Sequence, residues 1–107
     1  MVKEVNNFEE LMKILQTTSI VIIDFYATWC PPCKMISPHF AKISDNYKDR
    51  TDVAFIKVDV DKMEEAEVEA MPTFRVYKNG RLVDQVQGAP PPKQLENWIN
   101  KHTIKSS

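Results

Sequence analysis

An almost uninterrupted run of apolar and β-branched residues at positions 20–27, IVIIDFYA, most constrains how this chain can fold. A strand of this composition is buried on both faces, so it lies inside a sheet that helices cover on both sides. Asp24 is the one acid in the run. Cys30 and Cys33 follow it, and apolar residues then recur at helical spacing over residues 33–48. The sequence therefore predicts a buried strand, a pair of cysteines and a helix in direct succession.

The other predicted elements rest on hydrophobic periodicity and on turn residues. Asn7 and Glu10 have the spacing of a helix-capping box, and Asn79-Gly80 is typical of a two-residue hairpin turn. In chain order, the elements are strand 2–5, helix 8–17, strand 20–27, helix 33–48, strand 53–60, a short acidic helix 62–70, strands 73–78 and 82–86, and a helix that follows Pro90-Pro91-Pro92. This βαβαβαββα order predicts an α/β fold with three layers, α/β/α, around a central mixed sheet.

Size and charge limit the classes of protein to consider. The 107 residues suit a single domain, residues 1–107, and a net charge of −1 gives no basic surface for nucleic acid. No apolar run is long enough to cross a bilayer, and the polar N-terminal segment lacks the apolar core of a secretory signal. We therefore expect a soluble, cytoplasmic monomer with no nucleic-acid or membrane partner.

Cys30 and Cys33 are the only cysteines, and their position at a predicted helix start gives them a definite chemistry. Free backbone N–H groups and the positive end of the helix dipole favour the thiolate of Cys30 and lower its pKa toward about 7. Such a thiolate can attack a disulfide, after which Cys33 displaces the mixed disulfide and closes a Cys30–Cys33 bond. The pair thus predicts thiol–disulfide exchange.

Three less specific interpretations of the cysteine pair remain at this point. A purely structural disulfide closes a very small loop and adds little stability. A zinc site needs about four ligands, and only His39 and His102 remain to complete it, at unsuitable spacings, so we expect no metal site. A chance CxxC pair is the third interpretation. We assign no function to either histidine, and we expect Lys34 to be solvated.

Asp24 is unusual because a carboxyl group inside an apolar strand is costly unless it is paired or protonated. Burial raises the pKa of a carboxyl group, which suits an acid–base group that takes the proton of Cys33. Lys57, in the neighbouring predicted strand, is the expected counter-charge. A buried ion pair of purely structural value is the alternative.

Four separated segments, VIIDFYATWCPPCKMISPHF, VAFIKVDVD, MPTFRVYKNG and VQGA, resemble the thioredoxin family in order and spacing along nearly the whole chain. The resemblance implies the thioredoxin fold, with Cys30 as nucleophile, Cys33 as resolving thiol, and Asp24 and Lys57 assisting. It also implies that Met71-Pro72-Thr73 is the family's cis-proline loop, which faces the dithiol and pairs with substrate backbone. The positions that it implies for substrate contact are Trp29, Pro31, Pro32, Met71, Pro72, Thr73, Gly88 and Ala89.

Two of these positions have a simpler interpretation on the residues alone. Trp29 can pack on the core like most aromatic residues, and Pro72 can be a proline at the entry of a strand. The same resemblance implies a general protein disulfide reductase with no bound cofactor, which thioredoxin reductase recharges with electrons from NADPH. The implied substrates are disulfide-containing proteins such as peroxiredoxins or ribonucleotide reductase.

Pro31 departs from the family pattern, because most thioredoxins carry glycine there. A residue before proline avoids the α region, so we expect Pro31 to be extended and the helix to begin near Pro32. The missing N–H raises the pKa of Cys30, whereas the stiffer loop favours the disulfide, each by about 1 kcal/mol. Tryparedoxins, which a low-molecular-weight dithiol recharges, also carry WCPPC. A tryparedoxin-like carrier is therefore one alternative to a general protein disulfide reductase. A thioredoxin-fold binding module with dispensable cysteines is another.

Overall fold

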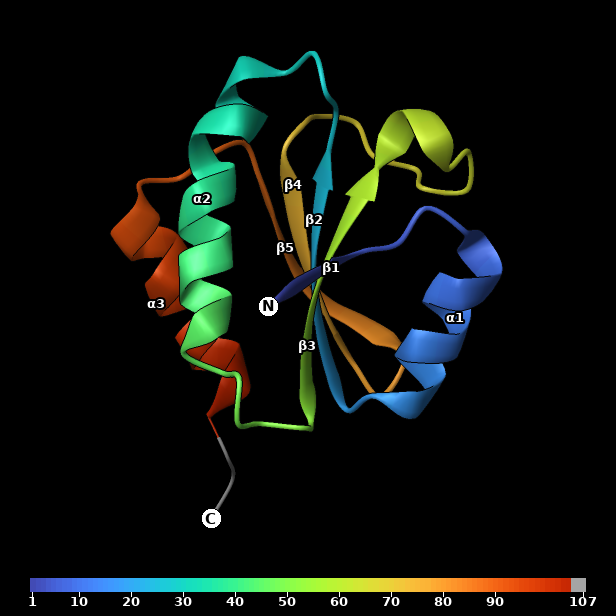
Figure 1. The fold of residues 1–107 in the computed structure, drawn as a ribbon, viewed down its shortest axis with the longest axis vertical. Helices are drawn as coiled ribbons and strands as arrows, with labels where there is room; N and C mark the ends of the chain where they lie inside the picture. The colour runs from blue at the N-terminus through green and yellow to red at the C-terminus, as the bar shows by residue number, and fades with distance from the viewer. Residues whose placement is uncertain (105–107) are drawn as a thin grey trace.

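The computed structural model describes residues 1–104, in which five strands form one mixed sheet with the order β1-β3-β2-β4-β5 (Figure 1). The strands are β1 (Val2–Glu4), β2 (Ile20–Tyr26), β3 (Val53–Asp59), β4 (Thr73–Lys78) and β5 (Arg81–Gln87), and the α-helices are α1 (Phe8–Thr17), α2 (Pro31–Asp45) and α3 (Pro92–Thr103). β1, β3 and β2 are parallel, whereas β4 is antiparallel to both β2 and β5. The predicted α/β class and mixed sheet are confirmed.

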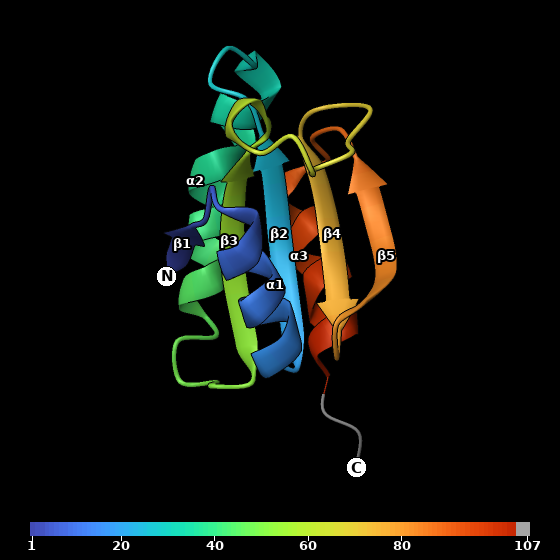
Figure 2. The same cartoon turned by 90° about the vertical axis from the view of Figure 1, so that its right-hand side faces the viewer.

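The helices divide between the two faces of the sheet. α1 covers one face, and α2 and α3 lie together on the other (Figures 1 and 2). The three layers are therefore α/β/α, as the alternation of strands and helices predicts. Among the described residues, no helix is both long enough and apolar enough to span a membrane.

β2 is the strand on which both hydrophobic cores depend. Ile22 packs into the cluster that α2 and α3 cover, whereas Val21, Ile23 and Phe25 pack into the cluster on the α1 face. All four side chains are at most 2% exposed. The alternation of these residues between two covered faces explains why almost every position of the strand is apolar. It also explains why Asp24 stands out.

The hairpin between β4 and β5 has the turn that its sequence predicts. Asn79 and Gly80 both have positive φ angles, 53° and 82°, as a type I′ turn requires. Glycine adopts such an angle without strain, and asparagine tolerates it better than most residues. The turn therefore sets the pairing of β4 with β5.

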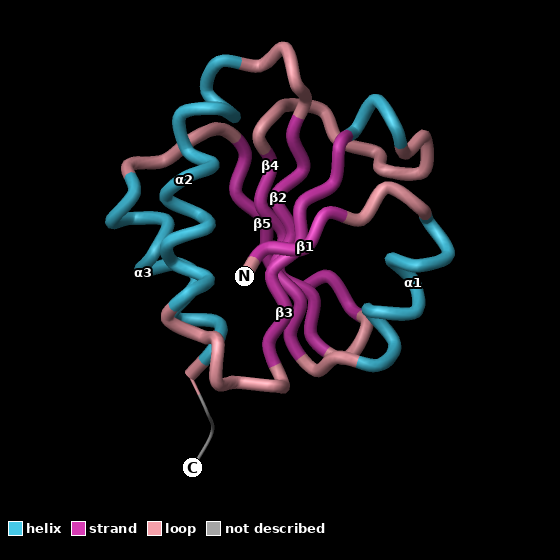
Figure 3. Tube along the Cα trace, in the orientation of Figure 1, coloured by secondary structure: helices cyan, strands magenta, loops and turns pink. Residues whose placement is uncertain are grey.

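The predicted acidic helix over residues 62–70 is wrong. A single 3₁₀ turn, η1 (Val60–Lys62), follows β3, and the chain then runs through irregular turns to β4 (Figure 3). Four glutamates in this short segment, Glu64, Glu65, Glu67 and Glu69, repel one another, and a nine-residue helix has little stability of its own. Burial of Met63 in the core on the α1 face anchors the segment without helical structure.

Candidate active site

Three loops meet at the edge of the sheet where β2 ends. β2 runs into the segment with the cysteines, and its Phe25 pairs with Thr73 at the start of β4. Thr73 in turn pairs with Gln87 at the end of β5. The antiparallel register thus places the cysteines, the Met71-Pro72 segment and Gly88 at one end of the molecule. Sequence spacing alone does not show this juxtaposition.

Cys30 and Cys33 form a disulfide at the start of α2, with their Cα atoms 5.3 Å apart. Cys30 is the N-cap of the helix, and Pro31 and Pro32 occupy its first two positions. The helix begins within one residue of Pro32, as expected, but the expectation that Pro31 is extended is wrong, because Pro31 is the first residue of the helix. The first N–H groups of a helix have no intrahelical acceptor, and the φ angle of proline suits the first turn, so two prolines cost no hydrogen bond here.

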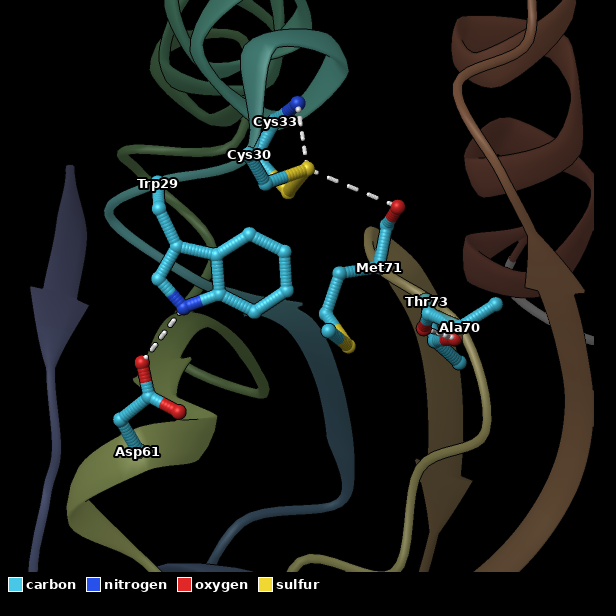
Figure 4. The surroundings of a disulfide bond; sticks show 7 residues. All are labelled: Trp29, Cys30, Cys33, Asp61, Ala70, Met71 and Thr73. Atoms are coloured by element: carbon cyan, nitrogen blue, oxygen red, sulfur yellow. Dashed lines mark hydrogen bonds between the residues drawn. A yellow bond between two sulfur atoms is a disulfide. The ribbon is translucent and has the colours of Figure 1, made fainter.

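Two backbone groups flank the sulfur of Cys30 (Figure 4). The N–H of Cys33 donates a hydrogen bond to Sγ of Cys30 at 3.2 Å, and the carbonyl oxygen of Met71 lies 3.6 Å from the same sulfur. The two cysteines are only 4% and 2% exposed. An N–H group directed at this sulfur from the positive end of a helix stabilises a thiolate there once the disulfide is reduced.

The Met71-Pro72 peptide bond is cis, which confirms the interpretation of this segment as a cis-proline loop. The loop is held at both ends: Oγ1 of Thr73 donates to the carbonyl of Ala70 at 2.6 Å, and the N–H of Gly88 donates to the carbonyl of Pro72 at 2.7 Å. Gly88 has a φ of 87°, which favours glycine. These contacts fix Met71 beside the disulfide.

Trp29 does not pack on the core, because 63% of its surface is exposed. Its indole Nε1 donates a hydrogen bond of 2.9 Å to Oδ2 of Asp61 in η1 (Figure 4). Oδ1 of Asp59 accepts from the N–H of Asp61 at 3.0 Å and so holds the turn in place. Sequence reasoning missed Asp61, since no local pattern links two residues that are 32 positions apart.

The side chain of Asp24 is almost fully buried, with 2% of the residue exposed, and its Oδ1 has no hydrogen-bond partner. Burial raises the pKa of Asp24 to about 7, against the opposing effect of the Lys57 charge. A cavity of about 360 Å³ is lined by both Asp24 and Cys33, and also by Lys34, which is exposed. The carboxyl group thus reaches the space behind the disulfide.

Lys57 lies beside Asp24 in the register of β2 and β3 and also lines this cavity. The ion pair that its ammonium makes is with another residue: Nζ lies 3.7 Å from Oε1 of Glu4. The expected counter-charge is therefore close enough to influence Asp24 but is bound elsewhere. Glu4 was not found from the sequence, because the weak β1 strand gave no register to align it with Lys57. Tyr26, whose ring centre lies 5.9 Å from Nζ of Lys57, was not found either.

One apolar hollow and one hydrogen-bonded histidine account for further residues considered in the sequence. Ala89 and Pro32, together with Met35 and Pro90, line an apolar hollow of about 510 Å³ next to the start of α2. His102, which has no predicted role, is hydrogen-bonded through Nε2 to Oδ2 of Asp84 at 2.8 Å, away from the cysteines. No cluster of three or more possible metal ligands occurs among residues 1–104.

Comparisons with known proteins agree with this geometry. The thioredoxin family model matches residues 1–101. A thioredoxin of Coprinus comatus is 46% identical over 105 residues, which cover 94% of this chain and 97% of the relative. The solved thioredoxin of Plasmodium falciparum has a TM-score of 0.85 and 41% identity, covering 94% of this chain and 99% of that chain. A chain from a structural study of thiol resolution in yeast mitochondrial 1-Cys peroxiredoxin by glutathione and thioredoxin systems has a TM-score of 0.81 and 39% identity, over 94% of each chain.

The two cysteines form a disulfide at the first turn of a helix in this fold. This arrangement is that of a thiol–disulfide oxidoreductase. The redox interpretation of the CxxC pair is confirmed. The chain belongs to the thioredoxin family, and it is a protein disulfide oxidoreductase.

Proposed function

We propose that this protein reduces the disulfides of partner proteins, with Cys30 as the nucleophile and Cys33 as the resolving thiol. The Cys30 thiolate attacks a substrate disulfide, forms a mixed disulfide and releases one substrate thiolate. Cys33 then attacks Sγ of Cys30, so that the second substrate thiolate leaves and two electrons have passed to the substrate. The observation that carries this assignment is the Cys33 N–H, 3.2 Å from Sγ of Cys30, because it stabilises negative charge on that sulfur.

Asp24 is proposed as the group that takes the proton of Cys33 when Cys33 attacks. Both residues line the same cavity, and a pKa of about 7 allows the carboxyl group to exchange protons near neutral pH. Lys57 assists by lowering the pKa of this buried acid against the larger effect of burial.

Asp24→Asn is expected to slow insulin-disulfide reduction at pH 7 by about tenfold or more, since general acid–base groups typically contribute about 10²–10⁴-fold. The rate of insulin reduction under saturating reductant measures the effect. Asp49→Asn, which removes an exposed carboxylate from the same protein, is the matched control and should retain the full rate. An Asp24→Asn variant that reduces insulin as fast as the wild type would show that the proposed proton acceptor is wrong.

The residues around the cysteines are proposed to receive the substrate polypeptide. They are mostly apolar and come from the three loops that meet at this edge: Trp29, Pro31, Pro32, Met71, Pro72, Thr73, Gly88 and Ala89. A substrate segment that exchanges disulfides with Cys30 must pass the Met71 carbonyl, which is 3.6 Å from the sulfur, and the exposed indole of Trp29. Exposed aromatic surface held by a hydrogen bond is well suited to such recognition.

The proposed source of electrons is NADPH, through a thioredoxin reductase, and the proposed compartment is the cytoplasm, where thiols are kept reduced. Peroxiredoxins are the proposed substrate class that has most support, since one similar chain comes from work on peroxiredoxin resolution. Pro31 supports the alternative, a carrier that a low-molecular-weight dithiol recharges, because tryparedoxins also carry WCPPC.

Insulin reduction driven by NADPH and thioredoxin reductase is expected to exceed reduction driven by a glutathione-derived dithiol peptide by at least about tenfold, equivalent to roughly 1.4 kcal/mol of discrimination. The assay supplies each reductant at equal reducing equivalents and follows insulin precipitation. Pro31→Gly is the informative variant, because it restores the residue common in thioredoxins. A wild type that prefers the dithiol peptide, with the preference lost in Pro31→Gly, would establish the alternative.

A further inference from the structure

Three charged residues form one row across three neighbouring parallel strands. In the sheet register, Glu4 of β1 is paired with Lys57 of β3, and Lys57 is paired with Asp24 of β2. The side chains of Glu4 and Lys57 are similarly exposed, 36% and 38%, whereas Asp24 is buried. Lys57 therefore stands between two carboxyl groups, one at the edge of the sheet and one inside it.

The ammonium group of Lys57 is held toward the outer carboxyl group. Its Nζ lies 3.7 Å from Oε1 of Glu4 and 5.9 Å from the centre of the Tyr26 ring. Glu4 is fixed in turn, since its Oε2 accepts from Nδ2 of Asn6 at 2.9 Å and its side chain is hydrogen-bonded to Tyr26. Oδ1 of Asp24, by contrast, has no hydrogen-bond partner.

We propose that Glu4 is a positioning residue for disulfide exchange: by pairing with Lys57 at the sheet edge, it keeps the ammonium group away from the Asp24 carboxyl group. This inference rests on the proposed role of Asp24 as the proton acceptor for Cys33. The contacts of Glu4 include Lys57 and Asn6 and not the cysteines, so Glu4 acts through Lys57. An Asp24 carboxyl group without a close cation keeps a higher pKa and is a stronger base toward the Cys33 thiol, while the more distant Lys57 offsets only part of the effect of burial.

The other groups around this row do not replace Glu4 in that role. The titratable and charged groups that face the row are Tyr26 from β2, Asp59 from β3, Lys62 from η1, and Cys33 and Lys34 from α2. Hydrogen bonds from Asn6 and Tyr26 and the charges of Lys57 and Lys62 hold the pKa of Glu4 below its usual value, so Glu4 is anionic at neutral pH. Burial and the hydrogen bond to Glu4 raise the pKa of Tyr26 to about 12, so Tyr26 stays neutral.

The test is a carbon-13 NMR titration of the Asp24 carboxyl group in the oxidised protein, which needs no activity and contains no free thiol. In Glu4→Gln the midpoint is expected to fall by about one pH unit from its wild-type value near 7, because the released ammonium group turns toward Asp24. Glutamine keeps the size of Glu4 and its acceptor for Asn6. Glu10→Gln is the matched control, since it breaks another surface pair, with Lys3 at 3.3 Å, and should leave the midpoint unchanged.

Lys57→Met separates positioning from a simple field effect of the Glu4 charge. If Glu4 acts through Lys57, Glu4→Gln lowers the Asp24 midpoint in the wild type but not in the Lys57→Met background. An unchanged midpoint in Glu4→Gln, or an equal fall in both backgrounds, overturns the inference.

The pH profile of insulin reduction distinguishes failure of this inference from failure of the proposed role of Asp24. Glu4→Gln should move the lower limb of that profile in the same direction as the NMR midpoint. If Asp24→Asn leaves the profile unchanged, the acid–base proposal itself fails. If Asp24→Asn alters the profile while Glu4→Gln does not, only the role of Glu4 is wrong.

Discussion

Cys30→Ser is expected to abolish catalysed insulin reduction, lowering the rate by at least about three orders of magnitude, as is usual when an enzyme loses its nucleophile. The reason is that the thiolate is the attacking species, and serine has a hydroxyl group that stays protonated at neutral pH. Serine preserves the size and the N-cap position of Cys30 at the start of α2. A loss of activity therefore reports the missing sulfur and not an unfolded helix, which circular dichroism checks.

Cys33→Ser is the matched variant, and it should fail at a different step. Its Cys30 can still attack a substrate disulfide, but no second thiol follows to release the substrate, so a covalent mixed disulfide accumulates. Non-reducing gel electrophoresis with an oxidised protein substrate detects this adduct, which reductant removes. Cys30→Ser should form no adduct. Insulin reduction at the wild-type rate in either variant, or adducts in both, contradicts the assigned order of attack.

Much of the fold followed from local sequence signals because several of them are strong and mutually consistent. The 20–27 run requires a strand covered on both faces, and Asn79-Gly80 requires a tight hairpin, so the sheet centre and its antiparallel edge were both predictable. The acidic segment 62–70 failed because its glutamates gave a helix-like composition without a cap or a length that could sustain a helix. The conformation of this segment depends on the burial of Met63, which is a tertiary contact.

The part of the candidate site that is formed by residues close together in the sequence was predictable. The part that depends on residues far apart in the sequence was not. Cys30 and Cys33 are three positions apart, and the strand before them and the helix after them place them at the start of α2. The partners of Trp29 and Lys57, which are Asp61 and Glu4, depend on the pairing of β1 with β3 and on the turn after β3. A three-residue edge strand contains too little pattern to specify that register.

Stability should fall as pH rises through the neutral range, because Asp24 is an acid whose pKa is higher in the folded protein than in the unfolded chain. The folded value of this pKa is about 7, and the ordinary value for an aspartate side chain is 3.8. Between these two values the native state holds a proton that the unfolded chain has released, so the free energy of unfolding decreases from about pH 4 to pH 7 and then levels off. The total loss is about 4 kcal/mol, of which about 3 kcal/mol falls between pH 5 and pH 8.

Asp24→Asn is expected to remove most of this decrease and to make the oxidised protein more stable than the wild type at pH 8 by up to about 4 kcal/mol. Urea unfolding of both oxidised proteins between pH 5 and pH 8 measures it. Asp84 and Glu4 do not produce the same slope: hydrogen bonding lowers the pKa of each, so their contributions are lost at acid pH, below this range. If the free energy of unfolding changes with pH in the same way in both proteins, ionisation of Asp24 does not destabilise the folded state. A slope present only in the wild type means that the carboxyl group proposed to move the Cys33 proton is kept at the expense of stability, which is the trade-off typical of a functional site.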